Sequence, residues 1–345
     1  MPENNPQVVE SAYLETLEGL LFAVKGQVHP PDRYLAVLRY NPEASGERHK
    51  DGVAYHRVYH FAEQEHILRT SYPRYMYYDP LYQVTLQCVP HVCIKKVYDP
   101  RLRLAEIRTQ TRRDDIEEDA LAFATLLQEQ AGIPGRSLGV SGSLLIGLQI
   151  PASDLDLTII GDQSCRAVYH SLQRLLEPGM NPEIRHFNQQ ELEQHYQERV
   201  ADTWMRFEDF VTIEKNKVFQ GKFRNRAYFI RFIKEPNETG ERYGDYRYTP
   251  LGQAGLTARV TSADEAIFTP CRYPLAEVEL FEGIRVETVD EIVSYRGRFC
   301  EQARAGDQIV AIGTVERVQA RDGRSWQRLL LGNRREDTMY LRGGT

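Results

Sequence analysis

Two short segments decide the fold of this chain: Gly139-Val140-Ser141-Gly142-Ser143-Leu144-Leu145-Ile146-Gly147 and Pro151-Ala152-Ser153-Asp154-Leu155-Asp156-Leu157. The first predicts a short strand that passes, at Gly142-Ser143, into a short apolar helix. Backbone N–H groups at such a junction, together with a serine hydroxyl, can hold phosphate oxygens. Glycine at the junction lets the backbone come close to a ligand. We therefore expect Gly142 and Ser143 to contact phosphate groups.

The second segment predicts a strand that presents two carboxylates together. Asp154 and Asp156 alternate with Leu155 and Leu157, and residues i and i+2 of a strand share one face. Their backbones should lie about 7 Å apart. Mg²⁺ is held in proteins by one or two carboxylates plus substrate phosphates. A phosphate-binding turn and a carboxylate pair on adjacent elements together indicate nucleoside triphosphate chemistry.

The two segments together resemble the catalytic signature of the DNA polymerase β-type nucleotidyltransferase superfamily. That signature is Gly-Ser, a short spacer, and then an acidic-apolar-acidic-apolar strand, here Gly142-Ser143 and Asp154-Leu155-Asp156-Leu157. The resemblance covers roughly residues 114–200, and the whole chain is similar to an archaeal-type group of larger predicted nucleotidyltransferases. It implies an enzyme that transfers an NMP from an NTP to a hydroxyl acceptor. It also implies that Asp154 and Asp156 are catalytic ligands of Mg²⁺ or Mn²⁺.

The family's third catalytic carboxylate lies on the next core strand, within an apolar-acid-apolar triplet. The matching place here is Pro182-Glu183-Ile184, so the resemblance implies Glu183 as the third catalytic acid. Pro182 departs from the usual pattern, because proline is rare inside a strand. Asp264 or Glu265 is an alternative third acid. A further alternative is that no third acid functions, which would leave a degenerate nucleotide-binding module.

A basic segment follows the expected core. Seven basic residues face one acid, Glu214, and give an excess of six positive charges: Lys215, Lys217, Lys222, Arg224, Arg226, Arg231 and Lys234. Two apolar runs around Arg224-Asn225-Arg226 predict a hairpin. We expect Lys222, Arg224 and Arg226 to bind the phosphates of an NTP or a polynucleotide. The alternative is a solvated strand face whose charges suppress edge aggregation.

The order of the expected elements predicts an α/β (α+β) fold with a mixed sheet as the nucleotidyltransferase core. Short strands dominate before residue 111, and strands alternate with helices between residues 112 and 235. After residue 240 the chain is β-rich and has a hairpin at Asp322-Gly323. We therefore expect an N-terminal β-rich domain at 1–111, the core at 112–235 and a β-barrel-like domain at 240–345, with an OB-like barrel as the candidate.

Composition limits the classes of protein that fit. Lys and Arg total 43 and Asp and Glu total 49, so the net charge of −6 argues against a generally basic nucleic-acid coat. No apolar run approaches the length of a membrane helix, and the N-terminus has no pattern of a secretory signal. Five scattered cysteines are typical of reduced thiols. We expect a cytoplasmic protein without a membrane partner.

Among hydroxyl acceptors, a polynucleotide 3′ end, RNA or DNA, is the first choice. The basic hairpin and the β-rich C-terminal region favour it. A small hydroxylated molecule or a protein hydroxyl is the second choice. A hypothesis of a different class is a nucleotide- or RNA-binding regulator whose transferase core has lost its activity.

Overall fold

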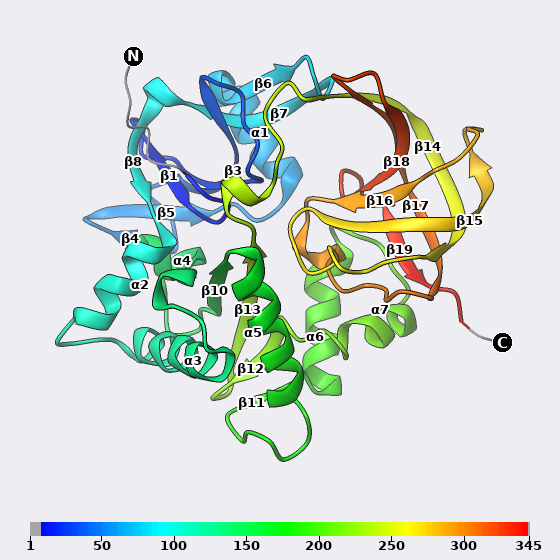
Figure 1. The fold of residues 1–345 in the computed structure, drawn as a ribbon. Helices are drawn as coiled ribbons and strands as arrows, with labels where there is room; N and C mark the ends of the chain where they lie inside the picture. Colours follow the sequence, from blue (N-terminus) through cyan, green and yellow to red (C-terminus); the bar gives the residue numbers. More distant parts are fainter. Residues whose placement is uncertain (1–7, 344–345) are drawn as a thin grey trace. The chain divides into compact units, whose positions relative to one another are not determined.

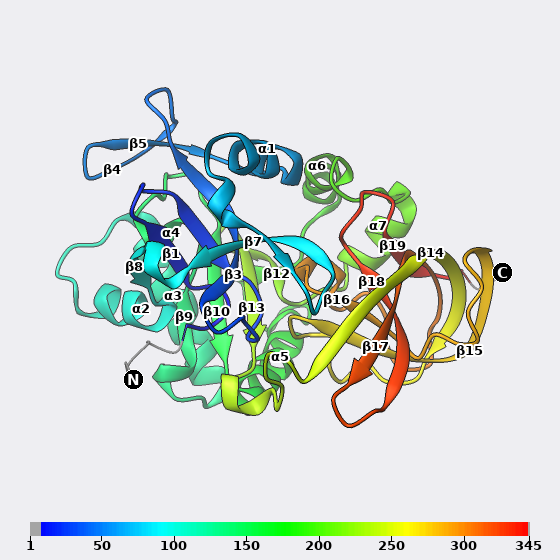
Figure 2. The ribbon, with the colours of Figure 1, turned by 90° about the horizontal axis from the view of Figure 1, so that it is seen from above.

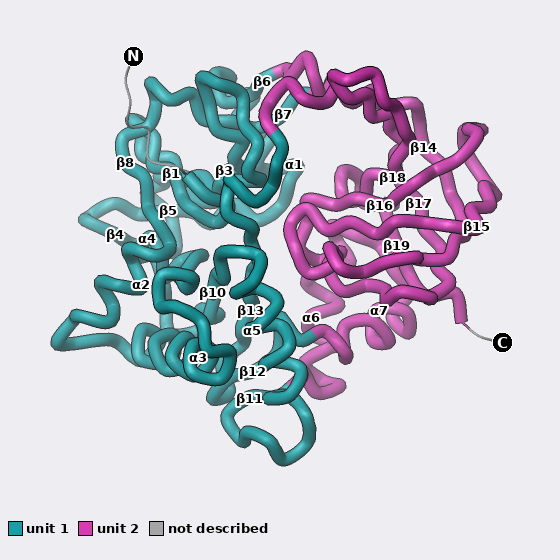
Figure 3. The backbone as a smooth tube through the Cα atoms, in the orientation of Figure 1, with its two compact units in different colours: residues 1–77, 85–185, 218–241 teal, residues 78–84, 186–217, 242–345 magenta. Residues whose placement is uncertain are grey.

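The computed structural model describes residues 8–343, which divide into two compact units (Figure 3). Unit 1 holds the residues up to 77 together with 85–185 and 218–241. Unit 2 holds 78–84, 186–217 and the residues from 242 on. All residues of the two segments quoted first lie in unit 1.

The N-terminal part of the chain forms an eight-stranded sheet in the order β4-β5-β3-β2-β1-β8, to which β7 is added beside β3 and β6 beside β7. Its strands are β1 (Tyr13–Thr16), β2 (Leu21–Val24), β3 (Arg33–Pro42), β4 (Arg48–Lys50), β5 (Val53–Arg57), β6 (Met76–Asp79), β7 (Val84–Pro90) and β8 (Ile94–Tyr98). Helix α1 (Phe61–Ser71) follows β5 and lies beside β3 (Figure 2). The 3₁₀ turns are η1 (Pro73–Tyr75) and η2 (His91–Cys93).

A five-stranded sheet in the order β11-β12-β13-β10-β9 follows. Its strands are β9 (Leu138–Val140), β10 (Leu155–Ile160), β11 (Ile184–Arg185), β12 (Gln220–Phe223) and β13 (Arg226–Ile233). The helices are α2 (Pro100–Thr109), α3 (Asp115–Ala131), α4 (Gly142–Ile146) and α5 (Asp162–Leu175), with 3₁₀ turns η3 (Gly135–Ser137) and η4 (Pro236–Glu238). Helices α3 and α5 contact each other and β10 (Figure 1).

Burial alternates along the start of β10 and fixes which face carries the acids. Leu155, Leu157 and Ile159 are fully buried, whereas Asp154 is exposed and Asp156 is half-buried. Helix α4, which also contacts β10, packs with the N-terminal sheet: Leu145, Ile146 and Leu148 share a core cluster with Tyr13, Leu21 and Tyr40. The start of α4 and the acidic end of β10 are therefore held by two sheets of the same unit.

Unit 2 contains a closed barrel. Strands β14 (Tyr246–Val260), β15 (Cys271–Gly283), β16 (Glu291–Ser294), β18 (Ser325–Leu331) and β17 (Gln308–Ala320) pair in that order, and β17 also pairs with β14. The ring is antiparallel except for β16 and β18, which run parallel. Strand β19 (Thr338–Leu341) pairs with the first part of β17. Unit 2 also holds α6 (Gln189–Val200), α7 (Phe207–Glu214) and η5 (Gly297–Phe299).

The expected mixed α/β architecture with several sheets and a C-terminal barrel is confirmed. The predicted hairpin around Arg224-Asn225-Arg226 is present, formed by β12 and β13. Its turn residues Arg224 and Asn225 both have positive φ. The strand expected around Pro182-Glu183-Ile184 is only Ile184–Arg185, so it begins after Glu183. No helix among residues 8–343 has the length and the apolarity that crossing a membrane would require.

Candidate nucleotide site

The carboxylates of Asp154 and Asp156 lie at the start of β10, beside the first turn of α4. β10 pairs antiparallel with β9, and the backbone N–H of Ser141 donates to the carbonyl of Asp156 over 2.8 Å. This hydrogen bond continues the pairing past the last residue of β9. It therefore holds the residues that begin α4 close to the Asp156 side chain.

Gly142 is in closest contact with that side chain. Its φ is +58°, and a β-carbon built on it would lie 1.9 Å from Oδ2 of Asp156. A side chain at this position would require the Asp156 carboxylate to move, and the left-handed backbone itself favours glycine. The Gly-Ser pair and the carboxylate pair are therefore parts of one site.

Ser143 is bound to the turn that leads into β10. Its hydroxyl donates to Oγ of Ser153 over 3.2 Å. The same Ser153 oxygen accepts from the backbone N–H of Ile150 at 3.0 Å and from the buried Arg48 at 3.2 Å. Ser143 is half-buried, so its hydroxyl links α4 to the loop that positions Asp154.

Both aspartates have raised pKa values in the metal-free protein. Desolvation, followed by the nearby negative charge of Asp154, raises the pKa of Asp156 to about 6, against the opposing charges of Arg231, Arg57 and Arg39. Desolvation also raises the pKa of Asp154, although part of its side chain remains exposed, and Arg57, Lys222 and Arg226 oppose the shift. A bound cation would stabilise the ionised form of both carboxylates and so offset this cost of ionisation.

The donor set suits one divalent cation that is shared with a ligand. Among residues 8–343, no group of three or more His, Cys, Asp or Glu side chains is placed to hold a metal. Two carboxylates are nevertheless sufficient for Mg²⁺, which completes its octahedron with waters and substrate phosphates. Asp154 and Asp156 are the residues that would hold it.

Glu183 does not join the two aspartates. It directly precedes β11, which is separated from β10 by β12 and β13, so three strand spacings of about 14 Å in total lie between them. Its exposed carboxylate accepts from Nε of Arg224 at 2.5 Å, and its carbonyl accepts from the Arg224 backbone N–H at 2.8 Å. The structure thus places Glu183 at the hairpin turn. Asp264 and Glu265 lie between β14 and β15 of the barrel.

Arg226 and Arg224, which were expected to bind phosphate, form ion pairs with carboxylates. Arg226 bonds to Asp119 of α3 at 3.1 Å and to the carbonyls of Pro151 and Ser153, and so it holds the loop before Asp154. Arg224 pairs with Glu183 and, at 3.7 Å, with Asp119. Lys222 lies on β12, and its charge partly opposes the rise in the pKa of Asp154. The cation excess of this segment is therefore largely used within the fold.

The structure places three arginines near Asp156, of which the sequence indicated only Arg231, as part of the basic segment. Arg39 comes from β3 and Arg57 ends β5, about a hundred residues before the acidic strand. Arg231 on β13 lies opposite Thr158 in the register with β10, on the acidic face, and pairs at 3.3 Å with the fully buried Glu10. The strand next to β10 thus carries an arginine and no acid on the face that Asp156 shares.

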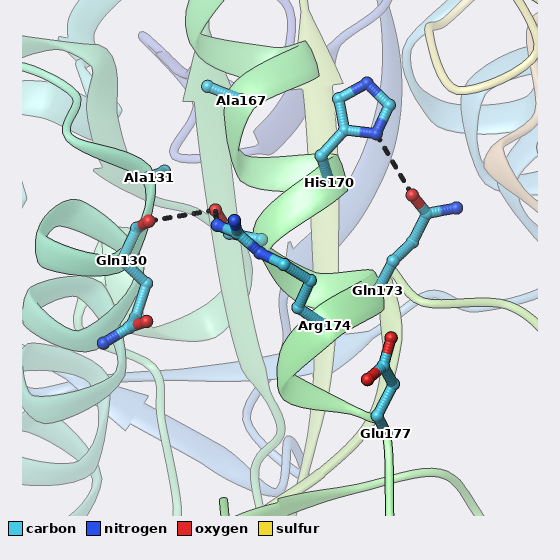
Figure 4. Close-up of a pocket in the computed structure, with 8 residues that line it drawn as sticks. Gln130, Ala131, Ala167, His170, Gln173, Arg174 and Glu177 are labelled. Carbon is cyan, nitrogen blue, oxygen red and sulfur yellow. Dashed lines mark hydrogen bonds between the residues drawn. The ribbon is translucent and has the colours of Figure 1, made fainter. Parts of the chain in front are cut away.

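His56 and Cys88, whose side chains are of types that can ligate a metal, have other contacts. His56 lies 2.9 Å from Glu63 and 3.4 Å from Glu47. Cys88 is buried and accepts from Arg33 at 3.8 Å. A separate surface pocket lies over α3 and α5 and contains none of the expected site residues; Figure 4 shows Gln130, His170 and Arg174 around it.

No protein-family model matches the sequence, and no solved structure matches it either. Among curated proteins, the chain is similar to the uncharacterized protein MJ1086 of Methanocaldococcus jannaschii. The two are 30% identical over 332 residues, which cover 94% of this chain and 95% of the relative. The alignment therefore includes the N-terminal sheet, the five-stranded sheet and the barrel. By this full-length similarity, the chain belongs to the same family as MJ1086.

Proposed function

We propose that the chain is a divalent-dependent nucleotidyltransferase of the DNA polymerase β type, which moves an NMP from an NTP to a hydroxyl acceptor. One observation carries the proposal. Gly142 at the start of α4 fits directly against Asp156, so a phosphate cradle and a carboxylate pair form one site. The resemblance in sequence places the same two features in the signature of that superfamily.

The residues of the site have distinct roles in this proposal. Asp154 and Asp156 hold the cation and, through it, the triphosphate. The bound cation would neutralise charge on the phosphates and favour departure of pyrophosphate. The backbone at Gly142 and Ser143 contacts phosphate oxygens, and Ser153 and Arg226 keep Asp154 in position through the preceding loop. Lys222 and Arg57 add positive charge near Asp154.

A polynucleotide 3′ end remains the preferred acceptor. The barrel of unit 2 supports it by analogy, because five strands closed into a barrel with one parallel pair resemble an OB-fold, which commonly binds oligonucleotides. A small hydroxylated molecule or a protein hydroxyl is the alternative acceptor.

A second candidate function is a nucleotide-binding protein without transferase activity. It is favoured by the absence of a third carboxylate beside Asp154 and Asp156 within residues 8–343. On β13, the strand next to β10, Phe229 and Arg231 lie on the same face of the sheet as Asp156. A core of this kind would bind NTP and a cation without activating an acceptor hydroxyl.

Incubation of the protein with each labelled NTP and with RNA, DNA or protein tests both candidates. Parallel reactions should contain Mg²⁺, Mn²⁺ or a chelator. The transferase proposal predicts label on one acceptor class together with released pyrophosphate, only when a divalent cation is present. Cation-dependent NTP binding without any labelled acceptor would instead support the binding protein.

A further inference from the structure

A row of exposed rings lies where β5 leads into α1. Tyr59 is 38% exposed and Phe61 is 50% exposed, and the exposed His60 stands between them. The Tyr59 and His60 rings contact each other edge to face at 5.4 Å. Exposed aromatic side chains that are adjacent to one another are unusual on a surface without a binding role.

The backbone under this row is fixed. Val58 is fully buried in the N-terminal core, and its N–H donates to the carbonyl of Arg39 over 2.9 Å. The carbonyl of His60 accepts from the N–H of Gln64 in the first turn of α1. Backbone hydrogen bonds on both sides of the row thus link it to β3 and to α1.

Two arginines accompany the rings. The Cζ atoms of Arg57 and Arg39 lie 5.5 Å and 5.8 Å from the centroid of the Tyr59 ring. The charge of Arg39 also opposes the rise that burial causes in the pKa of Tyr13. Within the described part of the chain, neither guanidinium forms an ion pair with a carboxylate at salt-bridge distance. Both keep positive charge available to a bound anion.

The arginines connect the ring row to the nucleotide site. The charge of Arg57 acts on both Asp154 and Asp156, and that of Arg39 acts on Asp156. The strands that carry these arginines also pack with α4, because Tyr40 of β3 and Tyr55 of β5 share a core cluster with Leu145 and Ile146.

We infer that Tyr59, His60 and Phe61, together with Arg39 and Arg57, form the subsite for the single-stranded 3′ end of a polynucleotide acceptor. Rings on a surface take unpaired bases by stacking, and guanidinium groups take the backbone phosphates between them. This inference rests on the proposed function, since it names the acceptor of the same site. The two guanidinium groups beside the rings favour an acceptor that carries several phosphates over a small molecule or a protein hydroxyl.

The barrel offers a less suitable surface along β15. Glu277, Glu279 and Glu282 of that strand are all exposed, and they would repel a phosphate backbone. The N-terminal sheet is therefore the stronger candidate for holding the acceptor next to the aspartates.

The test measures how tightly the full chain binds labelled single-stranded RNA and DNA oligonucleotides. Binding is monitored by fluorescence anisotropy, in the presence of chelator and without NTP. We expect Tyr59→Ala to weaken binding about tenfold, through loss of one stacked base, whereas Tyr59→Phe keeps wild-type affinity. Arg57→Gln should lower the slope of log K against log salt by about 0.7 for one lost phosphate contact. The RNA and DNA arms show which polynucleotide is preferred.

Two matched controls exclude general surface effects. Arg74→Gln removes an exposed arginine that pairs with Glu18 at 3.2 Å, and Tyr78→Ala removes an exposed tyrosine of β6. Both should bind as the wild type does. Melting temperatures of all variants establish that they are folded.

The inference is overturned if the wild type binds neither oligonucleotide, or if Tyr59→Ala and Arg57→Gln bind as tightly as the controls. It is also overturned if these variants lose Mg²⁺-dependent NTP binding and keep oligonucleotide binding, because the arginines would then serve the triphosphate. Failure of the wild type to bind NTP with Mg²⁺ counts against the proposed function, and the oligonucleotide arm decides the subsite separately.

Discussion

Gly142 and Asp156 are so close that a β-carbon on the glycine would lie 1.9 Å from Oδ2 of the aspartate. The two residues come from different elements, α4 and β10, which the hydrogen bond between Ser141 and Asp156 holds together. Because the phosphate-binding turn and the metal carboxylates are in contact, a change in either one should disturb the other.

We predict that Gly142→Ala displaces the Asp156 carboxylate and abolishes Mg²⁺-dependent NTP binding. The matched control is Gly147→Ala at the end of α4, where φ is +72° and the nearest atom to a new β-carbon is 4.0 Å away. Both substitutions carry the left-handed backbone penalty of about 1 kcal/mol, but only the first has a steric clash. Thermal melts with and without NTP and Mg²⁺ would measure the difference. Equal NTP-induced shifts in both variants would show that the contact has no functional consequence.

The raised pKa of Asp156 predicts how its removal changes stability with pH. A folded-state pKa of about 6 lies above the ordinary value of 3.8, so ionisation destabilises the metal-free fold as pH rises through 6. Asp156→Asn should therefore raise the melting temperature in chelator at pH 8 and have little effect at pH 4. Melting curves over that range check this. A stabilisation that is the same at both pH values would exclude the ionisation of Asp156 as its cause.

Arg226 and Arg224 should differ sharply despite being two residues apart. Arg226 is half-buried and bonds to Asp119 and to the loop before Asp154, whereas Arg224 is exposed in its pair with Glu183. We expect Arg226→Gln to cost about 2 kcal/mol of unfolding free energy and to weaken NTP binding. Arg224→Gln should cost less than about 1 kcal/mol and leave NTP binding intact. Urea unfolding and NTP titration of both variants measure this, and equal costs would contradict the assigned roles.

Glu183→Gln tests whether the third acid expected from the sequence takes part in catalysis. Its carboxylate is bound to Arg224 at the hairpin turn, three strands away from β10. We predict turnover close to that of the wild type, measured as released pyrophosphate at saturating NTP and acceptor. A loss of several orders of magnitude would restore Glu183 as a catalytic acid and imply that the hairpin rearranges on binding.

Much of the fold follows from local signals in the sequence. Strand β10 has the bounds expected from its apolar run, Leu155–Ile160. Helix α3 begins at the capping box of Asp114 and Glu117 and ends at the left-handed Gly132. The hairpin of β17 and β18 turns at residues 321–324 around Asp322-Gly323. In each case the deciding residues are neighbours in sequence.

Other features of the structure were not predicted from the sequence, for different reasons. Helix α2 had a usable signal, since Asp99 caps it and Pro100 is its first residue. Arg39 and Arg57 had none, because their distance from Asp156 depends on how the N-terminal sheet packs with α4. The ion pairs of the hairpin could not be predicted for a similar reason. Asp119 and Glu10, which balance Arg226 and Arg231, are far away in sequence.

NTP turnover in Asp154→Asn and Asp156→Asn most directly tests whether these two carboxylates hold the catalytic cation. Asp162→Asn is the control. Asp162 begins α5, and its carboxylate pairs with Arg166 at 2.8 Å. Asparagine keeps the size of the side chain but removes the charge that a hard cation requires. We expect both site variants to stay folded and to lose Mg²⁺-dependent NTP binding and all turnover, while the control keeps both. Wild-type turnover in either site variant would contradict the metal assignment and the transferase function built on it.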